Sequence, residues 1–418
     1  MELTSCQKNA LKHLQSNNNI FLTGKAGSGK SFLLSRYKEQ TGNKLYVVAA
    51  TGIAAVLVEG QTFHSFFKLG CFEGTREAYL ATMNKALFDD SFVSFIQNVK
   101  SVIIDEISMI PGYTLACAEE ICRRARFNSK PWGGIRIIAV GDFAQLPPVS
   151  RNGPVDWAFD HPVWEHSNFT PVVLKTMVRT QDDKLLYMLN KIRAGKTTKK
   201  IRRLLDSCLI PKERVYDARL QGTRVFPRNV QVDKYNNTKF NELNTPISTY
   251  NAIFSGDRWA RDRLEVSSPV PAKLRLRVGA VVLIRKNNMI EGYVNGTSGT
   301  VTSLDNSSVT VELTKGGKVI ILKTTYEYLY RNSVVATMTQ FPLCLGWALT
   351  GHKVQGATLD RAVVDLSSLW DSGQFYTMLS RVRSLDHIHL SGWDLASIKV
   401  AKKVQKFHES IGFVDVGD

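Results

Sequence analysis

The segment Gly24–Ser31 constrains this chain more than any other feature of its sequence, because it matches the pattern G-x-x-x-x-G-K-[ST] in full. An apolar run, Ile20–Thr23, precedes it, and an apolar run beginning at Phe32 follows it. Glycines in such a loop let successive backbone N–H groups face phosphate oxygens at the start of a helix. The pattern therefore predicts a phosphate site in which Lys30 contacts the β- and γ-phosphates of a nucleotide and Ser31 ligates magnesium.

The first part of the chain has the spacing of a parallel α/β sheet. After Ile20–Thr23, further buried-strand candidates occur at Leu45–Ala50, Ser101–Asp105 and Ile135–Val140, each separated by enough chain for a helical crossover. A short amphipathic helix is predicted before the first strand, over residues 7–15. Together these elements predict an α/β domain around the phosphate loop.

The pattern changes in the second half. A basic helical stretch, Leu185–Leu205, is followed much later by a second α/β-like segment that begins near Phe341. Between them, residues 278–323 contain short β-rich runs separated by Asn-Gly and Gly-Gly turns. We interpret this region as a small all-β module inserted into a second α/β domain, an organisation that 418 residues can accommodate.

Charge and composition narrow the classes of partner. The formal net charge of +17 favours a polyanionic partner, although an anionic membrane surface or simple solubility would also fit. No apolar run approaches the roughly 20 residues of a membrane-spanning helix, and no signal peptide opens the chain. The 6 cysteines are scattered without a C-x-x-C pair. We therefore expect a soluble intracellular protein with reduced thiols, no zinc site and no membrane partner.

Two further motifs supply polar groups at strand ends. The run Val102–Glu106 ends an apolar strand in two acids. Beside a phosphate loop, Asp105 is expected to hold magnesium through water, and Glu106 is expected to orient or deprotonate the attacking water. Without that loop, such a pair is usually part of a solvated turn. Gln145, within Gly141–Val149, is a candidate sensor of the γ-phosphate, and the alternative there is a proline-terminated turn.

A series of motifs in this order resembles the petite-integration-frequency (PIF) helicases, which belong to the 5′-to-3′ branch of superfamily 1 with RecD-like and Dda-like relatives. The resemblance runs from Gln7 to about Gly392. It is carried, besides the phosphate loop, by Thr51–Ala55, Thr62–Phe66, Asp105–Met109, Gly141–Val149, His352–Gly356 and Leu379–Arg381. The series as a whole is far more specific than any one of its members.

The resemblance implies an α/β fold with two RecA-like parallel-sheet domains of the P-loop NTPase type. The first would cover 1–170 and carry a small wedge-type insert at about 66–100. The second would comprise 171–265 and 338–418. A small SH3-like all-β insert at 266–337 would interrupt the second domain.

The resemblance also implies the roles of individual residues toward ATP and Mg²⁺. Gln7 would contact adenine, Ser31 and Asp105 would hold the metal, and Arg179 and Arg381 would act as arginine fingers from the second domain. Thr180 stands where the family usually has Gln. The catalytic set would be Lys30, Asp105, Glu106, Gln145, Arg179 and Arg381. The nucleotide-binding set would be Gln7, Gly24, Ala26, Gly27, Ser28, Gly29, Lys30, Ser31, Gln355 and Gly356.

For DNA, the resemblance implies a single-stranded path across both domains, with a tailed or forked duplex, or a G-quadruplex, as substrate and a monomer as the default state. Residues at matching positions are Thr51, Thr62, Phe63, His64, Ser65, His352 and Lys353. Phe66 and Phe67 fit either base stacking or the core. The basic runs Lys196–Arg203 and Lys399–Lys406 are either solvated helix faces or part of the electrostatic path. Arg123, Arg124 and Arg126 receive no role.

The function implied is an ATP-dependent 5′-to-3′ DNA helicase in genome maintenance, including replication, repair, recombination and telomere maintenance. A second hypothesis is a phosphate-loop ATPase that acts as a switch or loader without separating strands. The motifs around His352 and Arg381 favour the motor, because a one-domain switch does not need them. A helicase–nuclease subunit is disfavoured, since no clear second cluster of acids and lysine is present.

Overall fold

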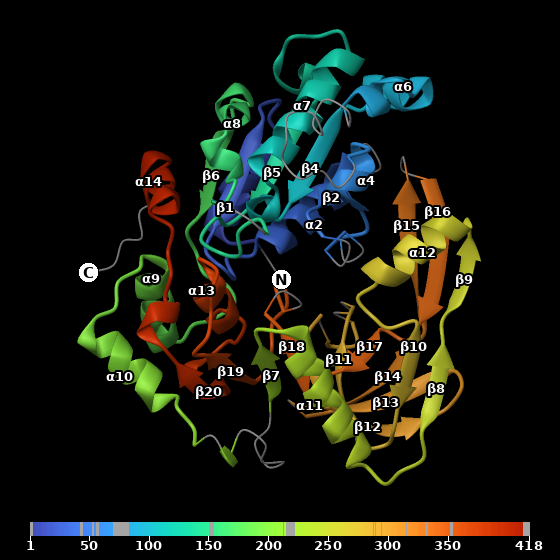
Figure 1. Ribbon diagram of the computed structural model, residues 1–418, viewed down its shortest axis with the longest axis vertical. Helices are drawn as coiled ribbons and strands as arrows, with labels where there is room; N and C mark the ends of the chain where they lie inside the picture. Colours follow the sequence, from blue (N-terminus) through green and yellow to red (C-terminus); the bar gives the residue numbers. More distant parts are fainter. Residues whose placement is uncertain are drawn as a thin grey trace. The chain divides into compact units, whose positions relative to one another are not determined.

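The computed structural model describes residues 3–41, 45–51, 54–55, 58–69, 83–149, 154–211, 213–214, 222–286, 288, 290–293, 295–314, 316–330, 333–351 and 354–412 (Figure 1). The chain divides into two compact units. The first comprises Met1–Val178, Tyr328–Val335 and Ala401–Val414, and the second comprises Arg179–Glu327, Ala336–Val400 and Asp415–Asp418. We describe each unit by itself.

The first unit is built on a parallel six-stranded sheet with the order β3-β2-β4-β5-β1-β6. Its strands are β1 (Ile20–Gly24), β2 (Leu45–Ala49), β3 (Gln61–Thr62), β4 (Ser101–Asp105), β5 (Arg136–Gly141) and β6 (Thr170–Leu174). Ile20 of β1 and Ile103 of β4 both pair with Ile138 of β5, which lies between them. The carboxyl ends of β1, β4 and β5 therefore share one edge of the sheet.

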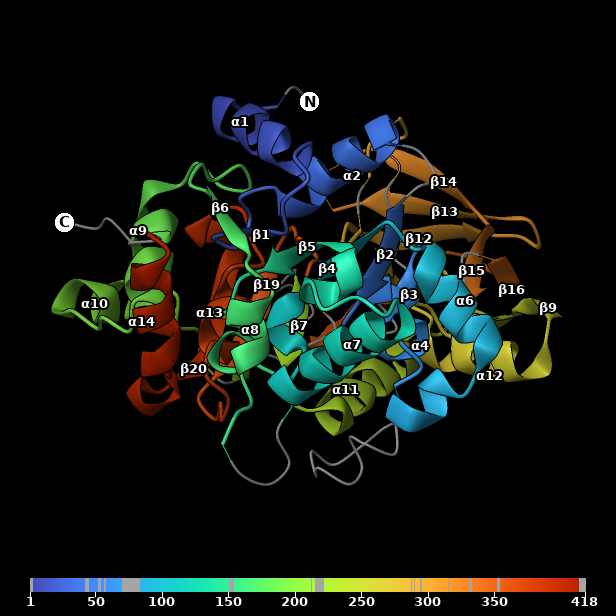
Figure 2. The same cartoon turned by 90° about the horizontal axis from the view of Figure 1, so that it is seen from above.

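Helices cover both faces of this sheet. Figure 2 shows α1 (Ser5–Leu14) and α2 (Lys30–Thr41) on one face, with α7 (Gly112–Ala125) and α8 (Pro162–His166) on the other. Leu14 and Leu33 pack against Ile20 and Ile138 in one buried cluster. The unit also contains α4 (Phe63–Phe66), α6 (Asp90–Asn98) and the helix α14.

The C-terminal helix α14 (Lys402–Ser410) packs in the first unit. Its Phe407 ring stacks on Phe159 at 4.5 Å between centroids and lies 5.9 Å from Phe21 of β1 and 5.5 Å from Phe143. The sequence-based boundaries place this helix in the second domain. Aromatic packing on the first sheet decides otherwise, and a boundary drawn from motif order does not detect such packing.

The second unit contains a four-stranded parallel sheet with the order β18-β7-β19-β20. Its strands are β7 (Thr223–Phe226), β18 (Ala348–Thr350), β19 (Ala362–Leu366) and β20 (Ile388–Trp393), and its helices are α9 (Asp183–Arg193), α10 (Lys199–Ser207), α11 (Asn229–Asn241) and α13 (Gln374–Leu379). The two parallel sheets confirm the predicted α/β class.

The predicted basic helical stretch Leu185–Leu205 forms two helices, α9 and α10. Gly195, with φ 70°, follows the end of α9, and its N–H donates to the Ile192 carbonyl at 2.9 Å. Thr198 then caps α10, because its hydroxyl accepts from the Ile201 N–H at 3.3 Å. Glycine after a helix and threonine before the next are the usual stop and start signals.

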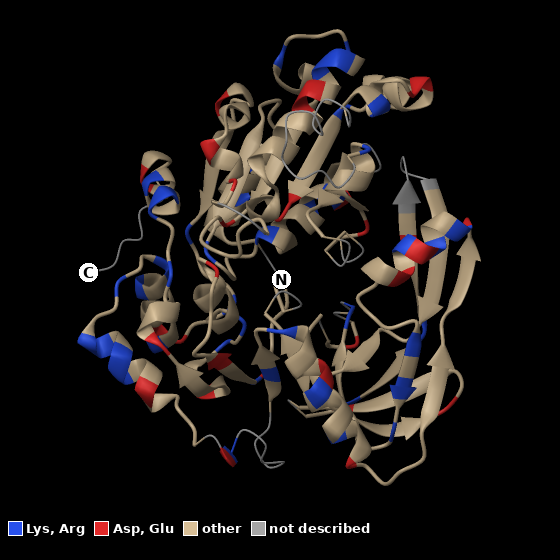
Figure 3. Ribbon diagram, in the orientation of Figure 1, with Lys and Arg blue, Asp and Glu red and all other residues tan. Residues whose placement is uncertain are grey.

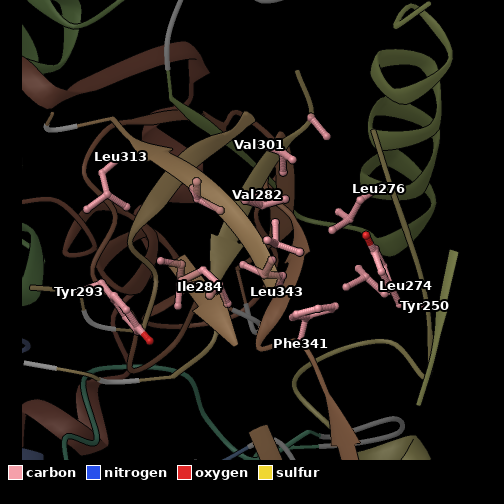
Figure 4. Close-up of a cluster of buried hydrophobic side chains, with 14 residues drawn as sticks. Tyr250, Leu274, Leu276, Val282, Ile284, Tyr293, Val301, Leu313, Phe341 and Leu343 are labelled. Atoms are coloured by element: carbon pink, nitrogen blue, oxygen red, sulfur yellow. The ribbon is translucent and has the colours of Figure 1, made fainter. Parts of the chain in front are cut away.

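The β-rich segment forms an antiparallel five-stranded sheet with the order β14-β13-β12-β11-β17. Its strands are β11 (Val281–Ile284), β12 (Ser298–Leu304), β13 (Ser308–Leu313), β14 (Lys318–Leu322) and β17 (Leu343–Leu345). A buried apolar cluster fills one side of it and includes Tyr250 and Leu274 (Figure 4). The core of the insert thus draws on residues that precede the predicted start at 266.

Further antiparallel pairs accompany this sheet. They are formed by β8 (Ser248–Asn251) with β10 (Lys273–Leu276), and by β9 (Ile253–Gly256), β15 (Thr324–Tyr330) and β16 (Ser333–Gln340), next to helix α12 (Arg258–Ser267). Among the described residues, no helix is both long and apolar enough to cross a membrane. The five cysteines of the described ranges are free thiols.

Candidate nucleotide and DNA site

The phosphate loop lies where the sequence predicts it, between the end of β1 and the start of α2. Gly27 and Gly29 adopt φ 86° and 84°, which only glycine reaches without strain. Gly24 is needed for close approach, since an added Cβ would lie 2.8 Å from the Leu174 carbonyl oxygen. Ser28 is buried, and its hydroxyl has no hydrogen-bond partner. A curled loop of this kind presents backbone N–H groups to an anion.

Lys30 begins α2, and its ammonium stays within the loop. Its Nζ donates to the Gly24 carbonyl at 2.7 Å and to the Lys25 carbonyl at 3.2 Å. Ser31, the next residue, is exposed. The motif predicts this arrangement, in which the lysine ammonium lies against the loop that is expected to bind phosphate.

Gln7 ties the first helix to this loop. Its Nε2 donates to the Ser28 carbonyl at 3.4 Å, and its Oε1 accepts from the Thr4 N–H at 3.0 Å. The Thr4 hydroxyl accepts in return from the Gln7 N–H at 3.2 Å, which completes a capping box at the start of α1. Gln7 is 2% exposed, so its amide is fixed against the phosphate loop.

Asp105 and Glu106 end β4 at the same edge of the sheet. Burial raises the pKa of the Asp105 carboxyl, and the charge of Glu106 raises it further, while the Glu106 N–H and the Lys30 ammonium oppose this. The Glu106 N–H donates to the Asp105 carboxylate at 2.9 Å. Glu106 itself adopts φ 53° and ψ 45°, a left-handed conformation that costs energy in a residue with a Cβ. Strain of this kind clusters at functional sites.

Gln145 follows β5, the strand that lies between β4 and β1 in the sheet. Its N–H donates to the Asp142 carbonyl at 2.9 Å, and the Asp142 carboxylate accepts from the Ala144 N–H at 3.1 Å. Gln145 is 5% exposed, and Asp142 is fully buried. Asp142 therefore holds the turn after β5 in one conformation. This turn places Gln145 at the carboxyl end of β5, beside β1.

In the second unit, both predicted arginine fingers contact one residue. Arg179 donates through Nη1 to the Ser380 carbonyl at 2.8 Å, and Arg381 donates through Nη2 to the Ser380 hydroxyl at 2.6 Å. Arg381 also donates through Nε to the Thr377 carbonyl at 2.6 Å and is 1% exposed. Ser380 was not predicted as a site residue, although its position just before Arg381 in the Leu-Ser-Arg motif is a signal for it.

Thr180, the residue after Arg179, forms a local hydrogen bond with the start of the next helix. Its hydroxyl accepts from the Asp182 N–H at 3.0 Å, and Asp182 in turn accepts from the Ser384 hydroxyl and from the Leu385 N–H at 2.9 and 2.7 Å. Gln355 and Gly356 lie in the turn after β18, where Gly356 is exposed with φ 74°. His352 and Lys353 lie outside the described residues.

The predicted DNA residues of the first unit follow β2 and β3. The Thr62 hydroxyl accepts from the Ser65 N–H at 3.1 Å and so caps α4, and the Thr51 hydroxyl accepts from the Ala54 N–H at 3.2 Å. The Ser65 hydroxyl lies 3.3 Å from that of Tyr328. Burial lowers the pKa of His64, which favours a neutral ring.

The resemblance places Phe63 on the DNA path, and the structure places its side chain in the core. Phe63 is fully buried, and its ring packs on that of Phe67 at 4.8 Å between centroids. Phe66 and Phe67 are also buried, which settles them as core residues. In a helix as short as α4, adjacent residues point in different directions, so Phe63 anchors the helix that carries His64 and Ser65.

The three arginines without an assigned role support the fold. One nitrogen of Arg126 lies 3.2, 3.1 and 2.7 Å from the carbonyls of Ile96, Gln97 and Val99 at the end of α6. Arg123 pairs with the buried carboxylate of Glu119 at 3.0 Å. Arg124 pairs with Glu120 at the surface, 2.6 Å away. A cation at a helix C-terminus satisfies carbonyls that have no partner within the helix.

Lys and Arg residues recur along α10 and β10, which Figure 3 marks in blue. On α10, Lys199, Lys200, Arg202 and Arg203 are exposed, and on α14 the same holds for Lys402, Lys403 and Lys406. Lys403 forms an ion pair with Asp160. No cluster of three or more His, Cys, Asp and Glu side chains that could hold a metal occurs among the described residues.

Comparisons with known proteins identify the family. A family model described as PIF1-like helicase matches residues 2–203, and one described as the 2B domain of DNA helicase Pif1 matches residues 261–304. The ATP-dependent DNA helicase Pif1 of Bdellovibrio bacteriovorus is 42% identical over 411 residues, which are 98% of this chain and 92% of that protein. The chain belongs to the Pif1 family of ATP-dependent DNA helicases.

Solved Pif1 structures have the same fold. The crystal structure of Bacteroides sp. Pif1 in complex with ADP-AlF4 superimposes with a TM-score of 0.86 and 29% identity, covering 99% of this chain and 97% of that one. Bacteroides Pif1 bound to ssDNA matches with a TM-score of 0.65 and 28% identity over 98% of this chain and 97% of that one. The predicted resemblance to the PIF helicases is thus confirmed.

Proposed function

We propose that this chain hydrolyses ATP to move 5′ to 3′ along single-stranded DNA as a monomer, and that it opens tailed duplexes, forks and G-quadruplexes in genome maintenance. The observation that carries the proposal is the division of polar groups between the two units. The first unit supplies the phosphate loop with Lys30 and the acids of β4, whereas the second supplies Arg179 and Arg381 around Ser380.

Magnesium fits the residues that the sequence assigned to it. The Asp105 carboxyl has a raised pKa because it is buried beside a second acid, so a cation there relieves an unfavourable negative charge. The Ser31 hydroxyl is exposed at the start of α2. Asp105 and Ser31 would hold Mg²⁺, which would neutralise charge on the β- and γ-phosphates.

The remaining groups have separate tasks. Lys30 would bind the phosphates, Gln7 would contact adenine, and Gln145 would respond to the γ-phosphate. Glu106 would orient the attacking water, and the two arginines would stabilise charge in the transition state. Thr51, Thr62, His64, Ser65, His352 and Lys353 would contact the strand, assisted by the formal net charge of +17.

Phosphate release with and without single-stranded DNA tests this proposal. We expect stimulation of about tenfold or more, because a motor couples hydrolysis to its track, and no turnover in Lys30→Ala or after magnesium is chelated. A switch or loader would show stimulation below about twofold. Turnover in Lys30→Ala equal to that of the unchanged chain would refute the phosphate site.

A further inference from the structure

A turn of the β insert lies against a loop of the second parallel-sheet domain. The turn precedes β12 and contains Gly296, whose φ is 94°. A Cβ at this position would lie 2.5 Å from the Thr358 carbonyl oxygen and 3.2 Å from the Ala357 Cβ. The contact is therefore backbone against backbone, and a side chain on residue 296 would force the turn and the loop apart.

Asp360 also links the turn of the insert to the loop of the second parallel-sheet domain. Its carboxylate accepts from the Ser298 N–H at 3.3 Å and lies 3.5 Å from the Ser298 hydroxyl. That hydroxyl also lies 2.8 Å from the Thr314 hydroxyl after β13, so the attachment extends into the sheet of the insert.

The other side of the loop contacts Arg381. The Leu359 N–H donates to the Arg381 carbonyl at 2.8 Å, and Arg381 Nη1 lies 3.4 Å from the Val354 carbonyl. The Ala357 N–H donates to that same Val354 carbonyl at 3.0 Å. Residues 357–360 thus have the insert on one side and the Arg381 backbone on the other, and the Arg381 guanidinium contacts the same Val354 carbonyl that accepts from the Ala357 N–H.

We propose that Gly296 and Asp360 are positioning residues for ATP hydrolysis: they hold the loop 357–360 against the β insert, and the loop holds Arg381. This inference rests on the proposed role of Arg381 as an arginine finger. It makes the β insert part of the machinery for hydrolysis through its contact with this loop. A shift of the loop would move the finger while leaving the phosphate loop of the first unit unchanged.

Two glycines of the insert allow a matched comparison. Gly292 has φ 79°, close to that of Gly296, but an added Cβ there meets no atom within 4 Å. Gly292→Ala and Gly296→Ala therefore carry similar backbone strain, and the second alone separates the turn from the loop. We expect kcat to fall about tenfold or more in Gly296→Ala with KM for ATP within about twofold, and neither constant to change beyond twofold in Gly292→Ala.

A second pair of variants addresses a folding defect. Asp360→Ala removes the acceptor for Ser298, whereas Asp360→Asn keeps an amide oxygen in its place. We expect Asp360→Ala to lower kcat and Asp360→Asn to recover most of it, with thermal unfolding midpoints of both recorded beside the unchanged chain. If Gly296→Ala fails to fold, this pair decides the question.

The possible outcomes distinguish a failure of the positioning role from a failure of the proposed function on which it rests. Arg381→Ala is measured in parallel. If its kcat stays at the level of the unchanged chain, the finger assignment is wrong and the proposed function fails at that point, together with the inference. If its kcat collapses while Gly296→Ala matches Gly292→Ala, or while Asp360→Ala keeps full turnover, the inference alone is overturned.

Discussion

Arg179 and Arg381, which are far apart in the sequence, both donate to Ser380, one to its carbonyl at 2.8 Å and the other to its hydroxyl at 2.6 Å. A guanidinium that acts on a developing negative charge must be held in a fixed position before the reaction. Ser380 provides a common support for both arginines. Their effects on hydrolysis are therefore expected to depend on each other.

A double-mutant cycle tests this dependence. Arg179→Ala and Arg381→Ala should each lower kcat on the order of a hundredfold or more, with nucleotide affinity within about threefold, because a finger acts mainly in the transition state. The double variant should lose less than the product of the two effects, since removing one arginine already disturbs the support of the other. Single-turnover hydrolysis measures the rates. Strictly multiplicative losses would show that the arginines act independently.

Glu106→Gln should keep ATP binding and lose hydrolysis. The amide preserves the size of the side chain but cannot take a proton from water, and general-base groups contribute about 10²–10⁴-fold. Equilibrium binding of a fluorescent ATP analogue and phosphate release measure the two properties. Glu39→Gln on α2 is the control, because Glu39 is exposed and pairs with Arg36. Rapid hydrolysis by Glu106→Gln would reduce Glu106 to a structural acid.

The raised pKa of Asp105 predicts a pH dependence of magnesium binding. A carboxyl with a raised pKa is ionised at high pH and takes up a proton, as pH falls, well above the usual value near 4. Magnesium-dependent nucleotide affinity should therefore weaken between about pH 8 and pH 5. Asp105→Asn lacks this titrating carboxyl, so its profile gives the part that comes from the nucleotide and from the other groups of the site. Identical profiles for the two proteins would contradict the assignment.

Arg126 should matter for stability and not for chemistry. Its guanidinium contacts three carbonyls at the end of α6 in partly buried or exposed hydrogen bonds, and a typical hydrogen bond contributes about 0.5–1.5 kcal/mol. Arg126→Ala should lower the free energy of unfolding by that amount, measured by denaturant titration. Arg124→Ala, whose side chain is 52% exposed, should stay within about 0.5 kcal/mol. A loss of equal size in both variants would contradict the role given to Arg126.

Particular residues show how far the sequence predicts the structure. The phosphate loop and the strands around it were predicted because the pattern of glycines, Lys30 and apolar runs fixes local structure directly. Phe63 was assigned to the DNA path from its place in the motif Thr62–Phe66, and the packing of its ring into the core required the structure. The placement of α14 depends on Phe407 meeting Phe21 and Phe159, which are distant in the sequence. Contacts of that kind leave no local pattern.

The same limit applies to the site. Each arginine was found from its motif, but Ser380 as their common partner required the structure. The contact between Gly296 and the backbone of Thr358 was equally absent from the pattern, because an Asn-Gly pair predicts a turn without saying what the turn touches. Glu106 was predicted from its position, and its left-handed backbone was not.

Strand separation on two tailed duplexes tests the central claim most directly. One duplex carries a 5′ single-stranded tail and the other a 3′ tail of the same length and sequence composition, and each is incubated with and without ATP. We predict that ATP opens the 5′-tailed duplex and leaves the 3′-tailed one closed. Opening of the 3′-tailed duplex alone would contradict the direction of movement, and opening of neither, despite hydrolysis stimulated by DNA, would contradict the proposal that this chain is a duplex-separating motor.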